Sequence, residues 1–177
     1  KDTTHICSVC GKNEYPIADE PHGMIKRVPD GNPMGCAPVS YNEPAFLSYG
    51  LKGNLNSSVC SNCAKTYVEG INWLLANGQI QKNDKGKEYL KYSNRKNFGK
   101  DTAMVYWLRE GNNFPDLDLL EEPNIGEIDE LINSVTSGKY HGIGVETNHF
   151  YSFILSGAAA RIFIRDWMEQ SLIELKK

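Results

Sequence analysis

Two pairs of cysteines carry the clearest chemistry in the sequence. Two residues separate Cys7 from Cys10, and two residues separate Cys60 from Cys63. This spacing lets a tight turn aim two sulfurs at one point, and two such turns supply the four thiolates of a tetrahedral structural zinc site. A catalytic zinc keeps one open position and commonly uses His or a carboxylate, whereas four cysteines close the coordination shell. We therefore predict structural zinc held by Cys7, Cys10, Cys60 and Cys63.

The interval between the pairs is long, and cysteine pairs have other uses. Between Cys10 and Cys60 lie 49 residues, against roughly 15 in common zinc fingers. The closure cost grows only with the logarithm of length, so the extra cost is about 1 kcal/mol, while a structural zinc site contributes on the order of 10 kcal/mol. Two disulfides, or a redox pair, are the alternatives. They are disfavoured because no secretory signal is visible and because a redox pair leaves the second pair unexplained.

The neighbours of the cysteines fit the same interpretation. Gly11 suits the left-handed backbone of such a turn, and Lys12 and Lys65 are expected to offset part of the negative charge of four thiolates. Cys36 stands apart from both pairs, and we expect it to be a small buried hydrophobe. The histidines are scattered, and neither His5 nor His22 has a ligand spacing.

The rest of the pattern predicts the elements that position these cysteines. Glycines and prolines interrupt the insert between the pairs, leaving room for short strands at 24–28 and 38–41. Apolar residues recur at helical spacing over 64–75 and stop at Asn77-Gly78, which predicts a helix leaving the second pair. Residues 79–100 are polar and basic, so we expect a solvated basic loop, with a nucleic-acid groove as the sharper alternative.

The last third of the chain predicts a strand, a helix and a hairpin. Residues 103–108 form a continuous apolar run typical of a buried strand, and a helical pattern begins at Ile125 and ends near Gly138. Residues 158–167 fit helical spacing and also alternate as a strand. The residues alone leave both interpretations open; the family resemblance described below favours a hairpin of 150–155 and 161–167, followed by a short helix from about Gln170, and we adopt that interpretation.

These elements give an α+β fold, a mixed small sheet with flanking helices and a four-cysteine zinc knuckle. We predict one domain over 1–177, excised from a longer chain. Its parts are a zinc-stapled looped insert plus helix over 1–78, the basic loop over 79–100, and a strand, helix and hairpin region over 101–177.

Composition excludes several classes of protein. The 177 residues are 40% hydrophobic and carry a net charge of -3, so the chain folds, and it does not coat nucleic acid through bulk charge. The apolar run at 103–108 is far shorter than the roughly 18 residues that cross a bilayer, and we expect a cytoplasmic location. A cluster of acidic side chains resembles a metal-dependent nuclease site only in composition, and we interpret it as a solvated loop. Its members are Asp116, Asp118, Glu121 and Glu122.

Several strings resemble one known family, the large subunit of type I-C (Dvulg subtype) CRISPR interference complexes. Its central region is similar to Ser40-Tyr-Asn42, Ala45-Phe46, Ser48-Tyr49-Gly50, Asn56, Tyr67, Asn72 and Leu74-Leu75. Further similar strings are Cys7-Ser-Val-Cys10-Gly11 with His22 and Ile25, Asp101-Thr102 with Val105-Tyr-Trp107, Leu155-Ser156 with Ala159-Ala-Arg161, and Arg165-Asp-Trp167. The chain departs from the family at Gly157 and Ala158, which stand where the family has Pro-Asn, and at Lys100, which replaces a Gly.

The resemblance implies a subunit that binds and assembles and does not cut. Its implied partners are the backbone subunits, the subunit that caps the guide RNA, the guide RNA, target DNA and a helicase-nuclease. Such subunits recognise a short motif flanking the DNA target, while guide pairing reads the sequence. The candidate nucleic-acid contacts are Arg161 and Arg165, with Arg95, Lys96 and Lys100 behind them. A stand-alone zinc-ribbon nuclease is the alternative.

Overall fold

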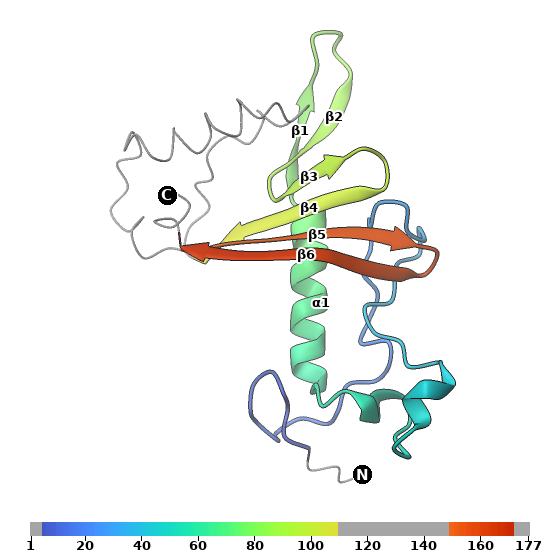
Figure 1. The fold of residues 1–177 in the computed structure, drawn as a ribbon. Helices are drawn as coiled ribbons and strands as arrows, with labels where there is room; N and C mark the ends of the chain where they lie inside the picture. The colour runs from blue at the N-terminus through green and yellow to red at the C-terminus, as the bar shows by residue number, and fades with distance from the viewer. Residues whose placement is uncertain (1–4, 110–148, 172–177) are drawn as a thin grey trace. The chain divides into compact units, whose positions relative to one another are not determined.

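The computed structural model describes residues 5–109 and 149–171 and has a mixed α+β fold (Figure 1). Its elements are η1 (Pro44–Leu47), η2 (Gly53–Asn56), α1 (Ser61–Ala76), β1 (Gly78–Lys82), β2 (Glu88–Tyr92), β3 (Arg95–Phe98), β4 (Thr102–Leu108), β5 (His149–Ala158) and β6 (Arg161–Ser171). One sheet pairs β1 with β2, and the other has the strand order β3-β4-β5-β6. The predicted class, small sheets with helix and a four-cysteine cluster, is confirmed.

The chain divides into two compact units, which are described separately. The first holds residues 5–105 and 154–165, and therefore contains all five cysteines. The described part of the second holds residues 106–109, 149–153 and 166–171. No helix in the described ranges is long and apolar enough to span a bilayer.

Helix α1 follows the second cysteine pair directly, as the periodicity predicts. Cys60 is its N-cap, and the side chain of Cys60 accepts a hydrogen bond from the Cys63 backbone N–H. Such a cap satisfies one of the backbone donors left open at a helix start. The buried face of α1 includes Ala64, Val68 and Leu75. The helix therefore ties one half of the cysteine group to the core of the first unit.

The β1–β2 hairpin begins immediately after α1 and needs a glycine at its first position. Gly78 pairs with Tyr92 in the antiparallel register. A Cβ atom at Gly78 would lie 2.4 Å from the Lys91 carbonyl oxygen, so no larger residue fits without a backbone shift. Residues 79–100, predicted as a basic loop, thus contain most of β1 and all of β2 and β3. The polar composition concealed these strands because both faces of the hairpin are largely exposed.

The turn-rich insert packs against the end of β5 and the start of β6. The backbone N–H of Gly157 donates to the Pro29 carbonyl, and that of Asn32 donates to the Ala159 carbonyl, at 2.8 and 2.9 Å. A Cβ atom at Gly157 would lie 2.5 Å from the Cα atom of Gly31, so this contact is a close backbone approach. Cys36 is fully buried beside it, as predicted.

Aromatic rings dominate the described part of the second unit. Trp107 stacks on Tyr151 with ring centroids 5.3 Å apart, and Phe153 stacks on Trp167 at 6.1 Å. Edge-to-face contacts join Trp107 to both Phe153 and Trp167. Such contacts stabilise aromatic pairs beyond the area that they bury. Trp107 was expected in the core of a buried strand, and it lies in this cluster, half-buried on β4.

The hairpin predicted near the C-terminus is present as β5 and β6. Three predictions of short elements disagree with the structure. The strands expected at 24–28 and 38–41 are absent, and the only pairing described in the first range is a bridge between Ile25 and Cys36. Strand β6 continues through Ser171, where a helix was expected from about Gln170. The predicted helix from Ile125 to about Gly138 and the acidic cluster at 116–122 lie outside the described residues.

Candidate metal centre

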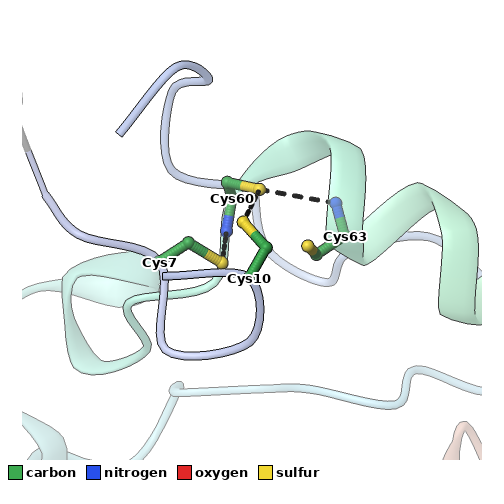
Figure 2. A group of neighbouring side chains, drawn as sticks. All are labelled: Cys7, Cys10, Cys60 and Cys63. Carbon is green, nitrogen blue, oxygen red and sulfur yellow. Dashed lines mark hydrogen bonds between the residues drawn. The ribbon is translucent and has the colours of Figure 1, made fainter. Parts of the chain in front are cut away.

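The four paired cysteines come together as one group. The sulfur atoms of Cys7, Cys10, Cys60 and Cys63 all lie within 4.8 Å of one another, and those of Cys10 and Cys60 are 4.0 Å apart. All four are free thiols. Figure 2 shows the side chains converging from two turns, one before and one at the start of α1. Two separate disulfides would pair the sulfurs at about 2.05 Å, so this arrangement fits one shared ligand better.

Backbone hydrogen bonds shape both turns. The first turn closes through Gly11, whose N–H donates to the Cys7 carbonyl at 2.9 Å with a φ of 70°, in the left-handed region that glycine tolerates. The two turns are joined by a bond from the Ser8 N–H to the Ser58 carbonyl at 2.7 Å. A bridge between Ile17 and Cys60 adds a second connection. These backbone contacts therefore connect the two turns that carry the cysteine pairs.

Amide groups also point at the sulfurs. The Val9 and Cys60 N–H groups donate to the Cys7 sulfur at 3.4 and 3.3 Å, and the Cys63 N–H donates to the Cys60 sulfur at 3.5 Å. Hydrogen bonds to a thiolate favour the charged form. Bonds from the backbone of Cys10 and Cys60 lower the pKa of Cys7 to about 6. The pKa of Cys63 is raised to about 12, first because its thiol donates to the Cys60 sulfur and second because of burial.

The donor set fits a tetrahedral soft cation. Sulfurs placed 2.3 Å from a central zinc lie about 3.8 Å apart, which small side-chain rotations reach from the observed spacing. Four thiolates prefer zinc or another thiophilic metal over calcium or magnesium, which take oxygen ligands. Cys7 and Cys60 are buried, whereas Cys10 is exposed, so one side of the group meets solvent. The four cysteines could thus hold a metal ion in a closed shell.

The two lysines that were expected to offset part of the thiolate charge each form a salt bridge with a glutamate. Lys12 forms a salt bridge with Glu14 at 3.7 Å, and Lys65 forms one with Glu69 at 3.8 Å. Both salt bridges are exposed to solvent, so they are weak. His22 is buried elsewhere, with Nδ1 2.6 Å from the Tyr67 hydroxyl. Neither His22 nor His5 belongs to the cysteine group, in agreement with their spacing.

Comparison with protein families gives the chain an assignment. Residues 1–177 match the family described as CRISPR-associated protein (Cas_Csd1). The chain belongs to this CRISPR-associated family. A search of curated proteins found no match. The match covers the whole sequence, including the cysteine group and both described ranges, and supports the broader part of the resemblance seen in the sequence.

The basic residues that the sequence analysis predicted as nucleic-acid contacts lie on two opposite edges of one sheet. Arg95 and Lys96 lie on β3, and Lys100 lies in the turn that follows, whereas Arg161 and Arg165 lie on β6. Strands β3 and β6 are the two outer strands. Three strand spacings of roughly 4.8 Å separate them by about 14 Å. The five residues therefore do not form a single contiguous contact.

The three arginines among these five residues already have partners within the first unit. Arg161 donates to the Asn42 Oδ1 atom at 2.8 Å and lies 3.9 Å from a Glu43 carboxylate oxygen. Arg165 donates from Nε to the Ser156 hydroxyl at 3.0 Å. The partners of Arg161 come from the insert, which is bridged to the start of β6, and the partner of Arg165 comes from β5.

Arg95 is half-buried and bonds mainly to backbone. Its Nη1 donates to the Arg27 carbonyl at 2.9 Å and its Nε to Asn97 Oδ1 at 2.7 Å, while the guanidinium lies over the Tyr92 ring. Burial lowers the pKa of Arg95, and the charge of Arg27 lowers it further. The neighbour Arg27, with Lys26, is a basic position that the sequence interpretation missed. Both lie in the range 24–28, for which the sequence predicted a short strand and no ligand contact.

Proposed function

We propose that this chain is a non-catalytic part of the large subunit of a type I-C, Cascade-type CRISPR interference complex. The observation that carries the proposal is the family match over residues 1–177. The finer assignment is supported by the strings along the chain that resemble that subunit, from Cys7-Ser-Val-Cys10 to Arg165-Asp-Trp167. In this proposal the protein acts in antiviral defence, in the cytoplasm.

The proposed role is to help recognise target DNA and its short flanking motif and to join the complex together. Guide pairing supplies most of the sequence specificity in such complexes, so the protein needs only local contacts to backbone and motif. Local cationic sites on a chain of net charge -3 suit that requirement. The partners in this proposal are guide RNA, target DNA, the backbone and guide-capping subunits, and the helicase-nuclease that cuts.

Zinc has a structural role in this proposal. Cys7, Cys10, Cys60 and Cys63 would hold it, and the ion would supply a fixed link between the two turns. Because all four ligands come from cysteine, the site offers no open position for a substrate or an activated water. The link fixes both ends of the insert, which carries the cationic residues Lys26 and Arg27.

The alternative, a stand-alone zinc-ribbon nuclease, makes a different prediction. It requires metal-dependent cleavage that disappears in the Asp116→Ala, Asp118→Ala variant. Our proposal predicts no cleavage by the purified protein and no effect of that variant on interference.

Co-purification tests the proposal directly. The full-length natural protein, tagged and expressed with its neighbouring CRISPR components, should elute with guide RNA and backbone subunits at a constant stoichiometry. Omitting the guide RNA should reduce that recovery. A protein that elutes alone, and that cleaves nucleic acid when supplied with metal, would contradict the proposal.

A further inference from the structure

A cationic cavity lies on the insert, away from the cysteines. Its volume is about 360 Å³, and it is open to solvent. The residues that line it are Lys26, Arg27, Val28, Gly31, Asn32 and Pro33. None of these lining residues is acidic. The long side chains of Lys26 and Arg27 belong to exposed residues, so both charges are accessible to a ligand.

Neither of these two cations is neutralised by a salt bridge within the described residues. Other lysines of the first unit are paired: Lys12, Lys65 and Lys82 each lie 3.5 to 3.8 Å from a carboxylate oxygen. The Arg27 guanidinium also has a second guanidinium nearby. Arg95, whose Nη1 bonds to the Arg27 backbone, is half-buried and has no salt bridge in the described ranges. Among the described residues, positive charge thus accumulates at this place without an ion pair to a carboxylate.

The backbone that presents the cavity is held in an unusual conformation. Arg27 has a φ of 60°, in the left-handed region that a residue with a Cβ rarely adopts. Asn72 of α1 fixes the segment before it, since its Oδ1 accepts from the Lys26 N–H at 2.7 Å and its Nδ2 donates to the Met24 carbonyl at 3.0 Å. The Arg95 bond to the Arg27 carbonyl holds the other side. A strained backbone kept by three side-chain bonds is a feature of binding sites.

The donors suit an oxyanion. An arginine presents several N–H groups in a planar fork, and a lysine adds a compact charge, which together are a common phosphate-binding set. Asn32 accepts a bond from the Met34 N–H through Oδ1, at 2.8 Å, which leaves its Nδ2 as a neutral donor at the cavity. Asp30 is exposed in the same loop but does not line the cavity.

We propose that Lys26 and Arg27 bind one phosphate group of a nucleic-acid backbone in this cavity, with Asn32 as a third donor. The inference rests on the proposed function for the source of the phosphate, which is target DNA or guide RNA. Arg95 is a positioning residue, because it holds the Arg27 carbonyl and adds to the positive charge. The site anchors the backbone and does not read bases.

The salt dependence of binding tests the site. The full-length protein in its complex is titrated with duplex target DNA, and separately with single-stranded RNA, at 50 to 200 mM salt. A lost phosphate contact reduces the slope of log K against log salt by about 0.9 for duplex DNA and about 0.7 for a single strand. The Lys26→Gln, Arg27→Asn double variant should show that reduction with one of the two ligands, which identifies the source. Asn is chosen because it tolerates the left-handed backbone.

The controls separate charge from fold and this site from the proposed function. Lys65→Gln with Lys82→Gln removes the same charge from two lysines that are already in salt bridges, and it should keep the slope. Arg27→Lys keeps the charge and should also keep the slope. An unchanged slope in the Lys26, Arg27 variant overturns the phosphate site alone. If the Lys26, Arg27 variant loses a partner subunit while its salt slope stays unchanged, the phosphate site is also overturned, and the two side chains are assigned to a contact with that subunit. Absence of any salt-dependent binding by the unmodified protein overturns the proposed function as well.

Discussion

Replacing Cys60 with serine should separate the loss of the metal link from every other role of this residue. Cys60 is both a member of the four-cysteine group and the N-cap of α1. Serine is a good N-cap, so Cys60→Ser keeps an acceptor for the Cys63 N–H and removes only a sulfur ligand. The variant therefore reports on the cross-link between the two turns.

The size of the effect follows from the loop that the link closes. With 49 residues between Cys10 and Cys60, a cross-link lowers the entropy of the unfolded chain enough to contribute about 4 kcal/mol at 25 °C. For a chain of this size, 1 kcal/mol corresponds to roughly 2–4 °C in Tm. A complete loss of the link should lower Tm by about 8–16 °C.

Calorimetry with a matched control measures this effect. Cys36→Ala is the control, because Cys36 is fully buried but lies outside the cysteine group. It should cost about 1 kcal/mol or slightly more through a small cavity, and its Tm should still fall when a chelator is added. Cys60→Ser should be insensitive to the chelator. If Cys60→Ser melts no lower than Cys36→Ala, and the unmodified protein ignores chelators, the cross-link argument is refuted.

Two further variants test the packing of the first unit. Burial lowers the pKa of His22, with a smaller opposing effect from the charge of Glu20, so the unfolded chain takes up the proton first and stability should fall as pH drops below about 6.5. Between pH 7.5 and pH 5.5 the urea midpoint should therefore fall less in His22→Gln than in the unmodified protein. Both proteins carry the same four cysteines, so any pH effect of the cysteines is common to both. An equal fall in the two proteins would contradict this prediction. Gly157→Ala should cost about 1–3 kcal/mol through overpacking against Gly31. Gly70→Ala in α1, where a Cβ meets nothing within 4 Å, should be neutral or stabilise by up to about 1 kcal/mol, and equal losses in the two glycine variants would contradict the close approach.

The sequence predicts those parts of the structure that depend on short-range periodicity or on ligand spacing. Helix α1, strand β4 and the β5–β6 hairpin have apolar patterns of the expected period, and the two cysteine pairs do converge. We chose the strand interpretation of Arg161–Trp167 over an equally good helical pattern because the resemblance favoured it, and strand β6 confirms that choice.

Other features depend on contacts that no local pattern encodes. Strands β1 and β2 carry exposed, polar faces, so they lack the apolar alternation that identifies a strand. Arg95 was interpreted as an exposed cation, yet it is half-buried and bonds to the Arg27 carbonyl, which lies 68 residues earlier. Lys26 and Arg27 were missed because their cavity exists only once the insert has packed on β5.

The zinc content of the gently purified full-length protein tests the central claim most directly. Elemental analysis should find about one equivalent of zinc per chain, retained in Cys36→Ala and lost in Cys60→Ser. Less than half an equivalent in the unmodified protein, or an equal zinc content in Cys60→Ser, would contradict a metal centre built from Cys7, Cys10, Cys60 and Cys63.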